Sequence, residues 1–193
     1  MRDLQIPTRE TEIIISELAK TRDIPGDVVE FGCYAGDTSI ELAKTLQDQP
    51  DKWLYLYDSF EGLPEKTSAD QSSSGWRFQA GELKVSPETV AHKFKKFGLP
   101  DPVIVKGWFN ELSDDDIPSS ISFALFDGDF YESIKASFEK VVPHLVQGGI
   151  IIVHDYRNPD LPGSAKAVNE FVSEHQDEYD FRLAASLAIL VKK

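Results

Sequence analysis

Two short runs of acidic and polar residues follow apolar, strand-like segments in the second half of the chain. One apolar segment leads into Asp127 and Asp129, and another leads into His154 and Asp155. Ligands of open α/β sheets bind at the carboxyl ends of the strands, so these side chains converge if the two strands are neighbours. Carboxylate oxygens with one imidazole nitrogen suit a divalent cation. The sequence therefore predicts a cation site at Asp127, His154 and Asp155.

Each of these residues also has a structural interpretation. Asp127 could cap a helix, His154 could pack in the core, and Asp155 could make a turn. Acids at the ends of two successive strands favour a functional site over three unrelated structural roles.

A second pattern lies in the first third of the chain, where an apolar strand over 27–31 breaks at Gly32 and a helix begins after Gly36. Such strand-to-helix turns hold adenosine-bearing cofactors in α/β enzymes. A dinucleotide site has Gly-x-Gly-x-x-Gly and a free helix N-terminus for pyrophosphate, whereas this turn carries carboxylates at Glu30 and Asp37. Those carboxylates repel pyrophosphate but suit an ammonium and a sulfonium. The turn therefore predicts S-adenosylmethionine, although glycines in such a turn can also simply relieve crowding.

Asp58 supports the cofactor prediction. It ends the next apolar run, 53–57, about 20 residues beyond the glycines, where such folds place an acid that binds the two ribose hydroxyls. The alternative is that Asp58 only caps a loop.

Together, the two patterns predict methyl transfer to a hydroxyl. A bound cation lowers the pKa of an alcohol and orients its oxygen towards the methyl carbon. Asp129, ionised beside the cation, is predicted to accept the proton, with Gly128 turning the chain so that Asp127 faces the cation instead. The alternative is that Asp129 caps a helix that begins near Tyr131.

The elements that position these residues alternate along the chain. Apolar strand-like runs alternate with helical patterns, which predicts an α/β fold: a doubly wound, mostly parallel sheet with helices on both faces. One domain over 1–193 is expected, with a helical segment in 1–25. The predicted strands are 27–31, 53–57, 103–105, 121–126 and 150–153, with a terminal hairpin over 181–191 and a helix from Ser86 to Gly98.

The segment 66–81 interrupts this alternation. It is polar and serine-rich but carries Trp76 and Phe78. Aromatic residues in a long loop usually cover something. We therefore consider two interpretations: a lid over the acceptor, or a surface loop whose aromatic side chains fold back on the core.

Composition excludes several classes of partner. The net charge of −13 disfavours nucleic acid and anionic membranes, whose binding depends on clustered Lys and Arg. Cys33 is the single cysteine, so no intrachain disulfide forms. The N-terminal residues lack the apolar core of a signal peptide, and no stretch approaches the length of a membrane span. A cytoplasmic protein with a small-molecule partner is expected.

The order of several sequence blocks resembles the macrocin O-methyltransferase family of S-adenosylmethionine-dependent enzymes, which methylate sugar hydroxyls on antibiotics and related glycosides. The resemblance extends from Gly26 to about Phe171, and its most specific blocks are Asp-Ser-Phe-Glu-Gly-Leu-Pro and Asp-Gly-Asp-x-Tyr. The blocks are 29–32 with Gly36, 58–64, 107–109, 127–133, 148–156 and 167–171.

The resemblance implies a Rossmann-like, seven-stranded sheet with an antiparallel last strand, and a sugar or glycoside as acceptor. It implies Mg²⁺, with Mn²⁺ as the alternative, at Asp127 and the His154-Asp155 pair, and Asp129 as the base. The residues expected around the cofactor are Glu30, Phe31, Gly32, Gly36, Thr38, Ser39, Asp58, Ser59, Gly107, Trp108 and Asp127.

Two departures from the family pattern bear on these expectations. The family usually has two consecutive acids where this chain has His154-Asp155, so a histidine replaces a carboxylate ligand or the metal site is altered or lost. The chain is also shorter than the antibiotic-tailoring members before the first strand, so dimer contacts and lids do not carry over. A homodimer is compatible with the sequence but not fixed by it.

Other classes of function remain open at this point. An inactive protein that binds the cofactor is one, and His154 keeps it open. Asp-x-Asp after a strand also occurs in haloacid dehalogenase-like phosphatases and in metal-dependent glycosyltransferases, but neither explains the turn from Glu30 to Gly36. A catechol-like diol would satisfy the same metal chemistry as a sugar.

Overall fold

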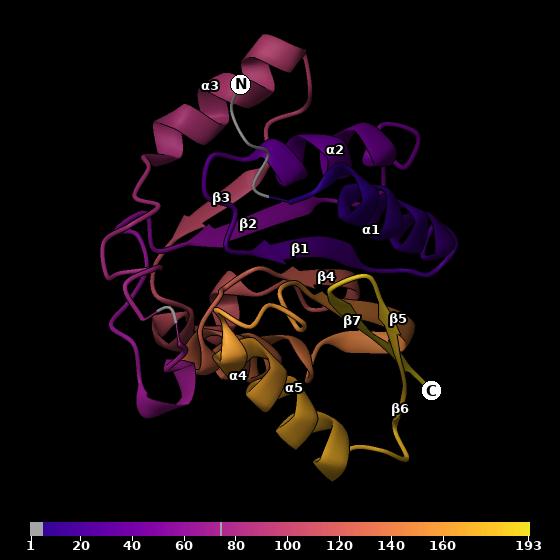
Figure 1. Cartoon of the computed structure of the whole chain (residues 1–193). Coiled ribbons are helices and arrows are strands. Elements are labelled where there is room, and N and C mark those ends of the chain that lie inside the picture. Colours follow the sequence, from indigo (N-terminus) through magenta and orange to yellow (C-terminus); the bar gives the residue numbers. More distant parts are fainter. Residues whose placement is uncertain (1–5, 74) are drawn as a thin grey trace.

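A single twisted sheet forms the centre of the molecule in the computed structural model, which describes residues 6–73 and 75–193 (Figure 1). Within those residues seven strands are ordered β3-β2-β1-β4-β5-β7-β6. The pairs from β3 to β5 are parallel, and β7 pairs antiparallel with both β5 and β6. This confirms the predicted Rossmann-like sheet with an antiparallel last strand. The strands are β1 Asp27–Phe31, β2 Leu54–Asp58, β3 Val103–Lys106, β4 Ile121–Phe126, β5 Leu145–Val153, β6 Tyr179–Ala184 and β7 Leu187–Lys192.

Helices cover both faces of the sheet, as Figure 1 shows. On one face lie α1 Thr8–Lys20, α2 Asp37–Leu46 and α3 Pro87–Phe97; on the other lie α4 Tyr131–Val141 and α5 Pro162–Glu174. Alternate residues of the strands enter the two resulting clusters of buried side chains, which is why the central strands are apolar on both faces. Among the described helices, none combines the length and apolar character needed to cross a bilayer.

Helix α3 has the predicted end signals. The Ser86 hydroxyl accepts a hydrogen bond from the backbone at the start of the helix, and Gly98 ends it in the left-handed conformation. Phe94 is buried, whereas Phe97, in the last turn of the helix, is half exposed, with the Lys44 ammonium over its ring.

Three parallel strands end at the same level of the sheet. Phe31 of β1 pairs with Phe126 of β4, and Phe126 pairs with Val153 of β5. The ladder continues one residue further, because the backbone N–H of Asp127 donates to Phe31 and that of His154 donates to Phe126, at 2.8 and 2.9 Å. The first residues after β4 and β5 are therefore held side by side by backbone hydrogen bonds.

Gly32, the first residue after β1, lies against the end of β4. Its φ is +91°, and a Cβ atom there would be 2.2 Å from the carbonyl oxygen of Asp127. The position thus excludes a side chain for two reasons, conformation and space.

The segment 66–81 is tied to the start of α4 by Asp70. This buried carboxylate accepts hydrogen bonds from the Thr67 backbone and hydroxyl and, at 2.7 Å, from the backbone N–H of Tyr131. Phe78 packs against a small apolar cluster beside α4, whereas Trp76 is 78% exposed. Of the two aromatic residues, one therefore folds back on the protein and the other does not.

We expect Gly32→Ala to destabilise the fold by at least about 3 kcal/mol, because the added methyl meets backbone that cannot move aside. Gly98→Ala is the matched control: Gly98 also has positive φ, but a Cβ there meets nothing within 4 Å. That variant should lose only about 1 to 2 kcal/mol of left-handed strain. Urea unfolding of both variants measures the difference, and equal losses would contradict the close approach.

Candidate active site

Two cavities lie at the carboxyl ends of the central strands. The larger, of about 760 Å³, spreads from the end of β2 to the start of α4 and the end of β5. The smaller, of about 550 Å³, lies between α1, α2 and the end of β1. Gly32, Tyr34 and Asp127 line both cavities. The two spaces therefore meet at the ends of β1 and β4.

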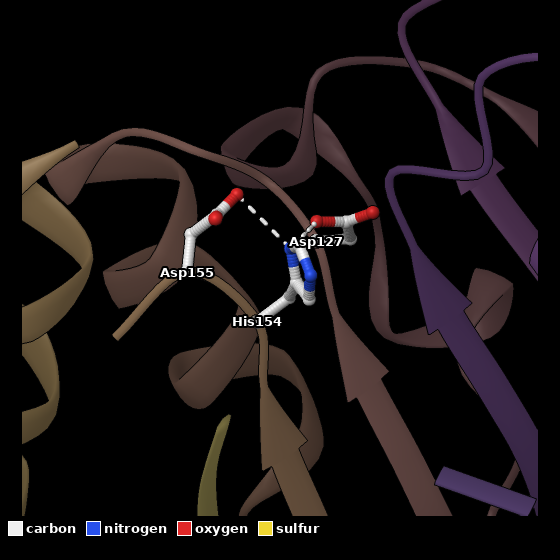
Figure 2. A group of neighbouring side chains, drawn as sticks. All are labelled: Asp127, His154 and Asp155. Atoms are coloured by element: carbon white, nitrogen blue, oxygen red, sulfur yellow. Dashed lines mark ion pairs between the residues drawn. The ribbon is translucent and has the colours of Figure 1, made fainter. Parts of the chain in front are cut away.

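Asp127, His154 and Asp155 converge as the sequence predicts (Figure 2). His154 Nδ1 lies 2.9 Å from Asp127 Oδ1 and 3.0 Å from Asp155 Oδ2. Nδ1 is buried, and neither contact has the geometry of a hydrogen bond. A buried ring nitrogen flanked by two carboxylates in this way fits the donor set of a divalent cation, with two hard oxygens and one nitrogen.

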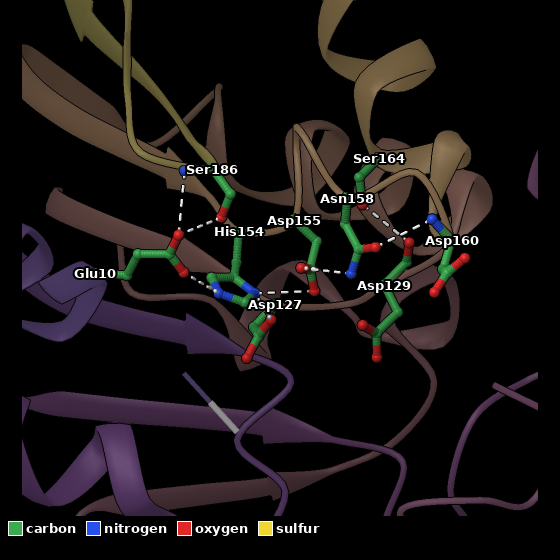
Figure 3. A network of polar contacts seen from close by, with 9 residues as sticks. All are labelled: Glu10, Asp127, Asp129, His154, Asp155, Asn158, Asp160, Ser164 and Ser186. Atoms are coloured by element: carbon green, nitrogen blue, oxygen red, sulfur yellow. Dashed lines mark hydrogen bonds and ion pairs between the residues drawn. The ribbon is translucent and has the colours of Figure 1, made fainter. Parts of the chain in front are cut away.

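The other ring nitrogen of His154 contacts a residue that the sequence analysis missed. His154 Nε2 is 3.0 Å from Oε2 of Glu10, which lies in the first turn of α1. Oε1 of Glu10 accepts hydrogen bonds from the backbone N–H and hydroxyl of Ser186, at 3.1 and 2.6 Å (Figure 3). A signal was present, because Glu10 precedes Ile14 by four residues and so shares the apolar face of the helix.

The charges around His154 are strongly coupled. Burial alone would lower the pKa of His154, but Asp127, Asp155 and Glu10 raise it, and the net shift is upward. The hydrogen bond to His154, followed by those to Ser186, lowers the pKa of Glu10 to about 2 against the opposing effect of burial. Glu10 is therefore ionised although it is buried.

Asp129 corrects one detail of the sequence prediction. The chain turns at Asp129 itself, with φ +61°, and not at Gly128. Gly128 is needed for space, because a Cβ there would lie 3.0 Å from the side chains of Phe109 and Ser133. Ser164 of α5 fixes the turn by donating to the Asp129 carbonyl at 2.9 Å. A non-glycine residue in this conformation is strained, as residues at functional sites often are.

The Asp129 carboxylate lines the larger cavity, and within the described residues it makes no hydrogen bond or ion pair. Burial, followed by the charges of Asp127 and Asp155, raises its pKa well above the ordinary value. A cation beside Asp129 would oppose this shift and favour the ionised form that the sequence analysis expects.

Asp58 lies at the end of β2 on the wall of the larger cavity. Its two oxygens accept hydrogen bonds from the backbone N–H groups of Tyr34 and Phe60, at 2.9 and 2.8 Å. Asp58 thus caps a loop, as in the alternative interpretation, but each oxygen keeps a second lone pair for a ligand, which leaves the expected contact with the ribose open. Burial raises the pKa of Asp58, and the backbone hydrogen bonds oppose that shift.

Glu30 differs from the sequence expectation in its charge. The side chain is 1% exposed, contacts the smaller cavity and accepts a hydrogen bond from the buried Ser39 hydroxyl. Burial raises the pKa of Glu30 to about 8, with Asp127 and Asp58 adding to the shift. Glu30 is thus mainly protonated at pH 7 in this structure, whereas the sequence analysis counted it as a carboxylate.

The remaining predicted cofactor residues fall into two groups. Thr38 lines the smaller cavity, and Ser59 and Trp108 line the larger one. Ser59 also closes a local turn, because its hydroxyl donates to the Gly62 carbonyl at 3.0 Å.

The second group, Phe31, Gly36 and Gly107, has structural roles next to the cavities. Phe31 is buried and stacks on Tyr57 with ring centroids 4.5 Å apart, so its side chain belongs to the core and only its backbone could contact the cofactor. Gly36 provides the left-handed residue before α2, and Gly107 donates to the Asp58 carbonyl at 2.9 Å. Neither glycine is a lining residue of the two described cavities.

Residues 11–190 match the profile of the family described as macrocin O-methyltransferase. The chain belongs to this family. Among curated members, a tetracenomycin rhamnosyl 4'-O-methyltransferase of Streptomyces olivaceus is 33% identical over 141 residues, covering 69% of this chain and 54% of the relative. Demethyldecarbamoylnovobiocin O-methyltransferase of Streptomyces niveus is 30% identical over 156 residues, covering 77% and 59%. The chain thus spans little more than half the length of these relatives.

A solved structure has the same fold. The O-methyltransferase NovP aligns with a TM-score of 0.85 at 24% identity, covering 98% of this chain and 82% of NovP. This similarity concerns the fold and agrees with the strand order described above.

The pKa of Glu30 predicts a pH-dependent stability difference for Glu30→Gln, which keeps the shape of the side chain but cannot ionise. A carboxyl group whose pKa is raised by folding binds more protons in the native state, so wild-type stability falls as pH rises from about 4.5 to about 8. The variant should gain up to about 1.4 kcal/mol on wild type per pH unit in that window. Urea unfolding at several pH values, with chelator and no cofactor, measures this. A pH-independent difference would contradict the shifted pKa.

Proposed function

We propose that this protein is an S-adenosylmethionine-dependent O-methyltransferase that methylates a hydroxyl of a sugar-linked small molecule with the help of a divalent cation. The observation that carries the proposal is that residues suited to a cofactor and residues suited to a cation meet at Asp127. On one side lie the acid and glycine positions of a cofactor cleft, Asp58 and Gly32, and on the other lies the donor set of His154 and Asp155. Membership of the family and the names of the two curated relatives support the same activity and acceptor class.

The residues around the larger cavity suit the cofactor. Asp58 would accept hydrogen bonds from the ribose hydroxyls through the lone pairs that its backbone partners leave free. Gly32 lines both cavities, so its backbone would be within reach of the cofactor where the two cavities meet. Glu30 and Asp127 would face the positive end of the cofactor. A cation next to Glu30 lowers its pKa, so cofactor binding and ionisation of Glu30 reinforce each other.

The proposed cation would be held by Asp127, His154 and Asp155, with Mg²⁺ or Mn²⁺ as the candidates. When bound, it supplies a lowered pKa and a fixed position for the acceptor hydroxyl. Asp129 lines the same cavity, with its carboxylate free of protein partners in the described structure. We assign to Asp129 the role of accepting the hydroxyl proton.

The segment 66–81 contributes to the acceptor side. Arg77 and Phe78 line the larger cavity, and Arg77 forms an ion pair with Asp160 in the loop before α5. We therefore keep the lid as a proposal for this segment, with Asp70 as its fixed end.

The cofactor proposal predicts that S-adenosylhomocysteine, and not NAD, UDP or phosphate, raises the melting temperature. Asp58→Ala should weaken S-adenosylhomocysteine binding by about 1.5 to 3 kcal/mol, the usual contribution of a hydrogen bond to a charged group. Asp116→Ala is the control, because Asp116 also caps backbone and hydroxyl groups but lines neither cavity. Calorimetric titration measures both; unchanged affinity in Asp58→Ala would remove it from the site, and stabilisation by UDP or phosphate would favour the Asp-x-Asp classes.

The catalytic proposal separates Asp129 from Asp127. Asp129→Asn should keep cofactor and Mn²⁺ binding but lose about two to four orders of magnitude in single-turnover rate, the typical contribution of a general base. Asp127→Asn should lose Mn²⁺ affinity itself. Chelator should abolish activity, and Mg²⁺ or Mn²⁺ should restore it. Full turnover in excess chelator would contradict the metal, and full turnover by Asp129→Asn would leave proton removal to solvent.

A further inference from the structure

Glu10 is a buried carboxylate far from the cation donors in sequence but next to one of them in space. It lies in α1, is 7% exposed, and its Oε2 is 3.0 Å from His154 Nε2, on the side of the ring opposite Asp127 and Asp155 (Figure 3). Its other oxygen is held by the backbone N–H and hydroxyl of Ser186 in the β6–β7 turn. Both carboxylate oxygens therefore have defined partners on opposite sides.

The chemistry of this contact decides which ring nitrogen faces the cation donors. A carboxylate only accepts hydrogen bonds, so the nitrogen that faces Glu10 must carry the proton. With a cation in place of the Nδ1 proton, a neutral His154 would keep its proton on Nε2 and present the lone pair of Nδ1 between Asp127 and Asp155. A carboxylate behind a ligating histidine fixes its tautomer and orientation and makes the other nitrogen a stronger donor.

We propose that Glu10 is a positioning residue of the metal centre, which holds His154 as the Nε2–H tautomer so that Nδ1 can bind the cation between Asp127 and Asp155. The inference rests on the proposed metal-assisted function. It adds a residue, Glu10, that is not one of the three proposed cation ligands. It also explains how His154 could be a cation ligand at a position where the family usually has an acid. The carboxylate of Glu10 would contact the histidine ligand and not the cation itself.

Helix α1 offers a matched control for a purely structural role. Glu17 lies on the same helix and is buried to a similar degree at 5% exposed, and it pairs with Lys20 and Arg182 and not with the cation donors. Loss of Glu17 should weaken the packing of α1 without changing the orientation of His154. Loss of Glu10 should weaken the packing of α1 and also change the orientation of His154.

The test is a calorimetric titration of the full chain with Mn²⁺. Glu10→Ala should lower Mn²⁺ affinity by about 10- to 100-fold, the usual effect of removing a partner behind a metal ligand. Glu10→Gln, which still accepts a hydrogen bond but has no charge, should fall between wild type and Glu10→Ala. Glu17→Ala should stay within about twofold of wild type, because it shares no partner with the site.

A double-mutant cycle with His154→Asp makes the test specific. In that background Glu10 faces a carboxylate with no proton between them, so Glu10→Ala should leave Mn²⁺ affinity unchanged or raise it. In the Mg²⁺-loaded wild type, ¹⁵N spectra of the imidazoles should show His154 protonated at Nε2 only. The chain has four histidines, and His154→Asp identifies the signal.

Three results would overturn the inference: wild-type Mn²⁺ affinity in Glu10→Ala, an equal loss in both His154 backgrounds, or an equal loss in Glu17→Ala. If wild type binds no Mn²⁺, the metal part of the proposed function fails together with this inference. Binding of S-adenosylhomocysteine would then show whether the cofactor part stands.

Discussion

The in-register pairing of β1, β4 and β5 is the constraint on which the rest of the site depends. Because the three strands are parallel and end at the same level, the residues that follow them are placed side by side by backbone hydrogen bonds alone. Gly32 then allows β1 to close against Asp127 without an intervening side chain. The two cavities share a wall at Gly32 and Asp127 for this reason.

This arrangement concentrates acidic side chains around one buried imidazole. Asp127, Asp155 and Glu10 surround one imidazole, and Asp129 stands close by. Buried charges are tolerated when they are paired and hydrogen-bonded, and here His154 is the shared partner of three of the four. Asp129 makes no such contact in the described structure, and burial, followed by the charges of Asp127 and Asp155, raises its pKa.

The strand-end residues were predictable because the carboxyl ends of parallel strands lie at the same edge of a sheet. Asp127 and His154 each follow an apolar run, and that pattern alone places them at one edge of the sheet. Glu10 was not predictable in the same way, since 144 residues separate it from His154 and its partner depends on how α1 docks. The turn at Asp129 was assigned to Gly128 because composition identifies a flexible residue but not its dihedral angle. The local sequence pattern thus predicted which residues form the candidate site. Tertiary packing determines the contacts and the conformation of each of them.

The hydrogen bond from Tyr131 to Asp70 has a consequence for how such proteins diverge. It attaches the loop to the start of α4, next to the strained turn at Asp129, through a buried carboxylate and a backbone N–H. The loop that follows supplies Arg77 and Phe78 to the cavity wall and carries an exposed Trp76. Sequence change beyond the anchor therefore reshapes the wall while the turn stays where it is. The loop beyond Asp70 can therefore diverge in sequence, and so alter the shape of the larger cavity, while Asp127 and Asp129 keep their positions.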